Sequence, residues 1–505
     1  MQEKQNEPPK FINLLMLFNS YSFFFIFLPS ALTIYFILNK LPVVEAGKIW
    51  LVFISFIFYA YCDTNYLVLL PLSIIINYFC SRYLSIDDSD THDKFLYFKK
   101  KVLLLGIIFN LCLLGYFKYA NFFISETNNL FHTNISLQNI VIPLAISFFT
   151  FNQIACLVDS YKKNIKGFDF VDYCLFVSYF PYLISGPLVR YTEIMPQFND
   201  LDNRYFNYQN ISEGLFLLSI GLFKKVIIAD NIAVWAINGF DKAATLTFLE
   251  AWTSSFCYTL QLYFDFSGYI DMALGIALMF NIKLPINFNS PYKALNIRDF
   301  WLRWHMTLSR WLRDYLYIPL GGNRNGRART SLNLFLTFLL CGLWHGAGST
   351  FLVWGILHGC GVIIHSFWRR LGVTMPNLIA WLITIMFVNF AWVFFRAKEF
   401  KDAYKVIGGM TGFSGIVFPG SLAYFLNFLS PYGVTFGNAF IHIEGDLSMI
   451  LMLLISIGIV LYAPNSMELK NRFNPSLKWA ICTIILMVSG LLCLTKITDF
   501  QYVNF

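Results

Sequence analysis

Residues 296–319 read NIRDFWLRWHMTLSRWLRDYLYIP, and this charged stretch decides how the chain can fold. It carries four arginines and two aspartates, so it cannot be an ordinary span that faces lipid. Its large apolar residues recur at steps of three and four, at Trp301, Trp304, Leu308, Trp311 and Tyr315. The spacing predicts one amphipathic helix with an aromatic face, lying at a membrane interface or dipping into a helical bundle.

The rest of the chain has the composition of an integral membrane protein. Of 505 residues, 57% are hydrophobic, 13% are charged and 55 are phenylalanine, which lies outside the range of soluble domains. No long polar linker, fixed-period repeat or low-complexity tract divides the sequence. We therefore predict a single polytopic membrane domain over residues 1–505. It should be all-α, because lipid admits only helices or closed barrels.

Apolar windows of spanning or near-spanning length run along the whole sequence and predict roughly a dozen or more helices. They centre on residues 23–38, 49–61, 66–80, 102–117, 140–158, 173–189, 214–235, 252–263, 266–280, 331–344, 350–367, 377–395, 447–462 and 479–494.

The basic residues in the loops predict the orientation of these helices. The first, third and fifth loops hold ten lysines and arginines, whereas the second and fourth hold only Lys118. Because cytoplasmic loops carry an excess of basic residues, we predict that the amino terminus lies outside. The same rule places the loop with Lys470, Arg472 and Lys478 inside, so the tail 495–505 should reach the outer face.

His345 is the strongest candidate for chemistry in the apolar part of the chain. It follows a basic loop, GGNRNGRART (321–330), and fourteen residues, 331–344, that would extend about 21 Å into a hydrocarbon core of about 30 Å. Its surroundings, GLWHGAGST (342–350), contain glycines that let the backbone turn or approach a ligand. An intramembrane histidine at such a break is a functional candidate, and the alternative is a hydrogen bond across the bundle.

Other titratable residues have simpler interpretations. His358 and His365 lie seven residues apart on one helical face, where packing is favoured. Asp265 and Asp271 are intramembrane carboxylates that could form a proton relay, but we favour their pairing with a nearby arginine or capping of a helix break.

Several catalytic and binding signatures are missing. There is no GxSxG or HExxH motif, and the GxxxxG spacing at Gly321 lacks the lysine and hydroxyl of a phosphate loop. The ten cysteines have no metal-ligand spacing, so no metal is expected. Despite a net charge of +8, the basic residues form no single stripe, so we expect no nucleic acid partner.

Four stretches together resemble the membrane-bound O-acyltransferases. They are YFDFSGYIDMALGIALMFNIKLPINFNSPY (263–292), DFWLRWHMTLSRWLRDYLYIPLGGNRNG (299–326), GLWHGAGSTFLVWGILHG (342–359) and AWVFFRA (391–397). The motif core therefore covers 263–397. The resemblance is greatest to the bacterial branch that O-acetylates peptidoglycan or alginate, which is related to the teichoic-acid D-alanylation acyltransferase.

This resemblance implies a bundle with re-entrant or interfacial helices, pierced by a tunnel between a cytosolic acyl donor and an outer acceptor. The histidine of the WHG motif is catalytic in that family and corresponds to His345. The histidine of the RWH motif is associated with the site and corresponds to His305, for which orientation or tunnel lining is the alternative. The implied donor is acetyl-CoA, with no bound cofactor. Arg324, Arg327 and Arg329 are candidates to bind its phosphates, or else they anchor the loop to lipid headgroups.

The last six residues, FQYVNF, fit a FxYxxF motif proposed in the resembling pathways to receive the acyl group on its tyrosine. Tyr502 is thus a candidate acyl carrier, and Phe500 and Phe505 would dock the tail. A phenol is deprotonated more easily than an alkyl alcohol, and its acetyl ester remains an acyl donor. The alternative is that these aromatic residues anchor the tail at the membrane interface.

The resemblance also implies a bacterial inner-membrane location, in which the loop charges place both termini at the periplasmic face. Because the sequence shows no large outer domain able to hold a polysaccharide, we expect a separate periplasmic O-acetyltransferase to accept the acetyl group. The acceptor is peptidoglycan or an alginate-like exopolysaccharide. A proton-coupled transporter or flippase that uses Asp265, Asp271 and the histidines is the rival interpretation, and a silent membrane scaffold is a third.

Overall fold

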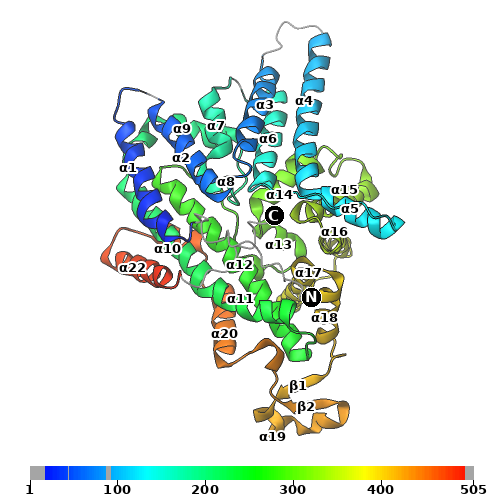
Figure 1. The fold of residues 1–505 in the computed structure, drawn as a ribbon. Helices are drawn as coiled ribbons and strands as arrows, with labels where there is room; N and C mark the ends of the chain where they lie inside the picture. The colour runs from blue at the N-terminus through cyan, green and yellow to red at the C-terminus, as the bar shows by residue number, and fades with distance from the viewer. Residues whose placement is uncertain (1–17, 44, 87–92, 166, 495–505) are drawn as a thin grey trace, which may run out of the picture.

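The structure is a computed structural model that describes residues 18–43, 45–86, 93–165 and 167–494, and it is almost entirely helical (Figure 1). The prediction of an all-α polytopic membrane protein is confirmed. The helices of the amino-terminal half are α1 (Leu28–Leu38), α2 (Ala46–Cys62), α3 (Leu69–Leu84), α4 (Asp93–Leu114), α5 (Ala120–Phe131), α6 (Ile146–Tyr161), α7 (Phe170–Ser178), α8 (Phe180–Leu183), α9 (Tyr191–Asn199), α10 (Tyr208–Phe223) and α11 (Asp230–Ile237).

The carboxy-terminal half contains both long and short helices. They are α12 (Phe248–Met279), α13 (Ile297–Arg303), α14 (Met306–Leu312), α15 (Gly326–His345), α16 (Ser349–Arg370), α17 (Asn377–Arg396), α18 (Phe400–Met410), α19 (Ala423–Leu426), α20 (Leu447–Tyr462), α21 (Ser466–Arg472) and α22 (Leu477–Leu492). Two short parallel strands, β1 (Ile416–Pro419) and β2 (Val434–Gly437), pair with Ile416 opposite Val434. This pair projects at the end of the molecule opposite α3 and α4 (Figure 1).

Turns of π-helix extend or interrupt several helices, and short 3-10 turns occur in the connections. The π-helical turns are Phe23–Phe27, Gly115–Tyr119, Lys224–Ala229, Asn238–Lys242 and Arg313–Tyr317, and the 3-10 turns are Leu201–Arg204, Pro291–Lys293, Gly420–Leu422, Asn427–Tyr432 and Ile441–Ile443.

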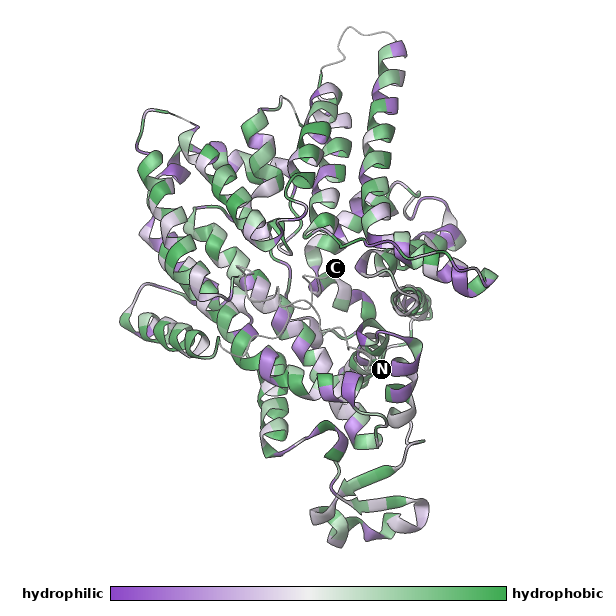
Figure 2. Cartoon of the chain, viewed as in Figure 1, coloured by the Kyte–Doolittle hydropathy of each residue, from purple (hydrophilic) through white to green (hydrophobic). Residues whose placement is uncertain are grey.

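Within the described residues, four helical segments are long and apolar enough to cross a membrane: Lys94–Phe131, Phe248–Met279, Ser349–Arg370 and Asn377–Arg396. The bent pair of α20 and α21 would add a fifth. Large hydrophobic side chains are exposed on the outside of the bundle, such as Ile26, Leu105 and Ile485, and Figure 2 shows hydrophobic residues along outer as well as inner helices. In a membrane protein, such a surface faces lipid.

The helix α12 lies at the centre of the fold. The apolar windows 252–263 and 266–280 predicted two helices, but the structure joins them into one helix of 32 residues whose apolar window is wholly buried. Glycines let α10 approach it closely, since a Cβ on Gly214 would lie 2.6 Å from the main-chain oxygen of Gly275. The separate windows were an artefact of Asp265, whose charge interrupts the apolar run.

Ion pairs satisfy the carboxylates of α12. Lys225 Nζ lies 2.6 Å from Asp265 and 2.9 Å from Asp230, and Lys224 Nζ lies 2.7 Å from Asp271. The predicted pairing of these aspartates therefore occurs, but with lysines rather than arginines. The two lysines belong to the π-helical turn Lys224–Ala229, which breaks the apolar window 214–235 into α10 and α11.

The charged stretch 296–319 is not one amphipathic helix, so that prediction is wrong. It forms α13 and α14, separated by His305 in a left-handed conformation with φ 43° and ψ 53°. The backbone here pairs with an extended segment instead of continuing the helix, because Asn289 N–H donates to Arg303 O (2.9 Å) and Met306 N–H donates to Asn287 O (3.0 Å). The segment is buried in the bundle through Trp304 and Leu308.

Candidate active site

His345 is the last residue of α15 and is only 2% exposed. The helix begins at Gly326, five residues earlier than the sequence indicated, so that half of the predicted basic loop belongs to it. Three aromatic rings surround the imidazole edge to face, with centroid separations of 4.8 Å to Trp344 and 5.1 Å to both Trp354 and Phe395. The histidine is therefore enclosed by aromatic rings, and we call this enclosure of Trp344, Trp354 and Phe395 the histidine chamber.

Lys118 and Tyr119 hold the end of the helix that carries His345. Lys118 Nζ donates to the main-chain oxygen of Trp344 and to Ser147 Oγ (3.2 Å), and Tyr119 Oη donates to the main-chain oxygen of Leu343 (2.7 Å). The last carbonyls of a helix have no partner within it, and a cation is favourable there. Lys118 is thus a buried hydrogen-bond donor near the site, and its assignment to an outer loop was wrong.

His305 approaches the same tryptophan from another segment of the chain. It is fully buried, its ring lies 4.9 Å from Phe266 and 6.4 Å from Trp344 between centroids, and its Nδ1 lies 3.1 Å from Asn287 Oδ1. The structure therefore brings the two candidate histidines to the indole of Trp344.

His358 and His365, for which packing was predicted, differ from each other. His358 is fully buried, and its Nδ1 accepts a hydrogen bond from Trp301 Nε1 at 3.2 Å, as the packing interpretation expects. His365, however, lines a cavity.

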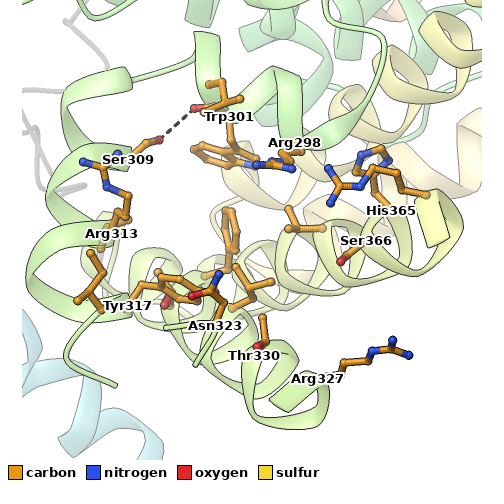
Figure 3. Close-up of a pocket in the computed structure, with 18 of the residues that line it drawn as sticks. Arg298, Trp301, Ser309, Arg313, Tyr317, Asn323, Arg327, Thr330, His365 and Ser366 are labelled. Atoms are coloured by element: carbon orange, nitrogen blue, oxygen red, sulfur yellow. Dashed lines mark hydrogen bonds between the residues drawn. The ribbon is translucent and has the colours of Figure 1, made fainter. Parts of the chain in front are cut away.

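The cavity has a volume of about 750 Å³ and lies between α13, α14, α15 and α16. Figure 3 shows polar and basic side chains from these elements around it, with Ser309 Oγ donating to Trp301 O. Its arginines are Arg298, Arg313, Arg327, Arg369 and Arg370. Its inner wall includes Trp301 and Phe338.

Two ring contacts separate this cavity from His345. Trp301 lies 5.8 Å from Trp354 between centroids, and Trp354 lies 5.1 Å from His345. The cavity thus has basic side chains around it and an aromatic wall toward the histidine chamber.

The charges around the cavity are unevenly balanced. Arg313 pairs with Asp314 at 2.7 Å, and Arg190 also pairs with Asp314. Burial opposes ionisation of Asp314, but the hydrogen bonds and positive charges of Arg313 and Arg190 outweigh it and lower the pKa of the carboxyl below its usual value. For the other four arginines of the cavity, no ion pair occurs within the described part of the chain, so the cavity favours an anionic ligand.

Of the three arginines predicted to bind phosphate, Arg327 lines this cavity, whereas Arg324 and Arg329 are not among its lining residues. Phe500, Tyr502 and Phe505 lie outside the described residues.

One cluster of three carboxylates in the described part of the chain is close enough together to hold a metal ion: Glu45, Asp169 and Asp172. Lys48 Nζ already lies 2.7 Å from Glu45 and 2.6 Å from Asp172, so an ammonium satisfies this cluster.

Sequence reasoning missed two residues of the site, Lys118 and Asn287. Each contacts a segment remote in sequence, and Lys118 is 226 residues from Trp344. Their only signal was a polar residue in an otherwise apolar stretch.

Known proteins resemble this chain over most of its length. The model of the membrane-bound O-acyltransferase family matches residues 94–398. The chain is 50% identical over 434 residues to the peptidoglycan O-acetyltransferase of Helicobacter pylori, covering 80% of this chain and 81% of that protein. It is 38% identical over 408 residues to the probable alginate O-acetylase of Pseudomonas aeruginosa, covering 79% and 75%. It is 28% identical over 279 residues to the teichoic acid D-alanyltransferase of Bacillus subtilis, covering 52% and 71%.

Proposed function

The chain belongs to the membrane-bound O-acyltransferase family, and we propose that it moves an acetyl group from cytosolic acetyl-CoA across a bacterial inner membrane. The acetyl group is destined for O-acetylation of a cell-envelope polysaccharide. The proposal rests on one observation: the rings of His305 and His345 both contact Trp344, close to a cavity lined by arginines.

The cavity suits the nucleotide end of the donor. Acetyl-CoA carries phosphates, and guanidinium groups bind phosphate through paired hydrogen bonds. Arg298, Arg327, Arg369 and Arg370 supply positive charge at the cavity, and the pantetheine arm would extend past Trp301 toward His345. The aromatic wall between the cavity and the chamber would exclude water from the thioester.

The transfer step needs a base near the thioester. A neutral imidazole, at His345 or His305, takes the proton of the attacking hydroxyl, and the hydroxyl oxygen forms a bond to the acetyl carbonyl carbon. The carbon–sulfur bond then breaks, and the CoA sulfur leaves with a proton returned by the imidazolium. General base catalysis of this kind typically contributes about 10² to 10⁴ in rate.

Tyr502 is the proposed acyl carrier, with Phe500 and Phe505 docking the tail. Both termini would lie at the periplasmic face, as the distribution of loop charges favours. A separate periplasmic O-acetyltransferase would pass the acetyl group to the polymer. Peptidoglycan is the proposed polymer, because identity is 50% to the peptidoglycan O-acetyltransferase and 38% to the alginate relative.

The test is reconstitution of the full chain with acetyl-labelled acetyl-CoA. Wild-type protein should release CoA, and His345→Ala should abolish that release while retaining the fold. Undiminished release by both His345→Ala and His305→Ala would reject the mechanism.

The carrier role is tested separately by intact-mass analysis. Acetyl label should appear on the carboxy-terminal peptide and vanish in Tyr502→Phe. Retained polymer acetylation in Tyr502→Phe cells would support the interfacial anchor instead.

A further inference from the structure

A buried hydrogen-bond network surrounds Asn287, which is 1% exposed. Its Oδ1 accepts from Thr307 N–H at 3.1 Å and from Thr307 Oγ at 2.9 Å. The same oxygen lies 3.1 Å from Nδ1 of His305. Three polar groups thus converge on one amide oxygen.

The orientation of the Asn287 amide follows from the backbone. A main-chain N–H can only donate, so a flipped amide would set its NH₂ group against the N–H of Thr307. The hydroxyl of Thr307 accepts from Leu188 N–H at 3.1 Å, which leaves its own proton for Asn287. Nδ2 of Asn287 has no partner among the described residues, so the oxygen alone sets the orientation.

The tautomer of His305 is then determined. Because Asn287 Oδ1 is an acceptor, the ring nitrogen that faces it must carry a proton. On the proposed function of this site, we infer that Asn287 is a positioning residue that holds His305 as the Nδ1–H tautomer and makes Nε2 its basic nitrogen. In that tautomer, His305 can serve through Nε2 as one of the two imidazole bases of the proposed transfer step.

The position of the His305 ring is fixed too, in this case by the backbone. His305 has φ 43°, a conformation that costs a non-glycine residue free energy and persists only where the surroundings enforce it. Here the N–H of Met306 is bound to Asn287 O, and the ring of Phe266 packs against the imidazole at 81°. Asn287 therefore anchors both the main chain and the side chain of this turn.

The pH profile of kcat distinguishes a positioning role of Asn287 from that of an ordinary buried amide. In Asn287→Ala, kcat should fall about 10- to 100-fold with little change in KM for acetyl-CoA. In Asn287→Asp, the carboxylate should restore part of kcat and make the imidazole more basic, since an opposite charge favours the charged ring. The imidazole then becomes protonated at higher pH, so the acidic limb of kcat should move upward by about one pH unit or more.

The matched control is Asn77→Ala. Asn77 is a fully buried asparagine on α3 that bonds Asn110 on α4, far from the histidines in sequence and on other helices. Its loss should lower thermal stability and leave the acidic limb in place. An Asn287→Asp profile that coincides with wild type, or an unchanged kcat in Asn287→Ala, would overturn the inference.

A second measurement does not depend on activity. Solid-state NMR of ¹⁵N-histidine-labelled full-length protein in lipid should show a protonated Nδ1 for His305, assigned with His305→Gln. A protonated Nε2 with unprotonated Nδ1 would reject the tautomer, whereas absence of CoA release by wild-type protein would reject only the proposed function.

Discussion

The side-chain nitrogen of Lys118 donates a hydrogen bond to the main-chain oxygen of Trp344, the residue before His345. It also lies 5.7 Å from the centre of the Trp344 ring. A lysine from the π-helical turn after α4 thus fixes the carbonyl end of α15, where the histidine begins the turn toward α16.

Lys118→Met should therefore lower CoA release about 10- to 100-fold, because a small displacement of a catalytic group has effects of that size. Lys118→Arg should retain more activity, since it keeps a hydrogen-bond donor at the helix end. The measurement is kcat and KM in proteoliposomes. Equal losses in both variants, with normal stability, would show that the helix end does not depend on a donor at this position.

Binding of the donor should depend on the arginines of the cavity and not on those outside it. Arg298→Gln or Arg369→Gln should raise KM for acetyl-CoA roughly tenfold with kcat nearly unchanged, since a hydrogen bond to a charged group contributes about 1.5–3 kcal/mol. Arg324→Gln and Arg329→Gln are the controls, because these residues do not line the cavity. A larger rise in KM in the two control variants would indicate that acetyl-CoA binds near Arg324 and Arg329 instead of in the cavity.

Packing of α10 on α12 should be sensitive to a single methyl group. Gly275→Ala would place a Cβ 2.5 Å from the main-chain oxygen of Gly214 and should destabilise the protein by roughly 1–3 kcal/mol. Gly408→Ala in α18 meets no atom within 4 Å and should be neutral or slightly stabilising. Thermal unfolding in detergent compares the two, and similar midpoints would contradict the close approach.

The ion pairs of α12 make a further prediction that separates structure from proton transfer. Asp271→Asn leaves Lys224 without its buried counter-charge and should destabilise by about 3–5 kcal/mol. Lys224→Met combined with Asp271→Asn should recover much of that stability while CoA release continues. Loss of release in a stable double variant would favour the proton-relay interpretation of this aspartate.

Much of the fold class and the positions of both histidines could be predicted from sequence. Composition requires membrane helices, and the short motifs around His305 and His345 identify the family. The sequence could not show that residues 252–280 form one helix, because Lys225 neutralises Asp265 from another segment. Nor could helical spacing show the break at His305, since the pairing of Met306 with Asn287 competes with the helix only in three dimensions.

The site could be predicted only in part, again because some of its contacts join segments that are remote in sequence. A histidine beside glycines in an apolar stretch is unusual enough to be noticed, but a single lysine or asparagine is not. Lys118 looked like a loop residue because its partner is a main-chain carbonyl group. Every residue has such a group, so no partner could be recognised in the sequence. The single-domain boundary at 1–505, the tunnel and the role of Tyr502 stay predictions.

The burial of α12 on every side has a consequence for biosynthesis. A helix that carries Asp265 and Asp271 gains little by partitioning into lipid alone, because these charges are matched only by Lys224 and Lys225 of the π-helical turn between α10 and α11. Those elements precede it in the chain, so insertion of α12 is a cooperative event with its predecessors. Once α12 has left the ribosome, it should already be protected in the nascent chain, and deletion of α10 should leave α12 outside the bilayer for quality-control proteases.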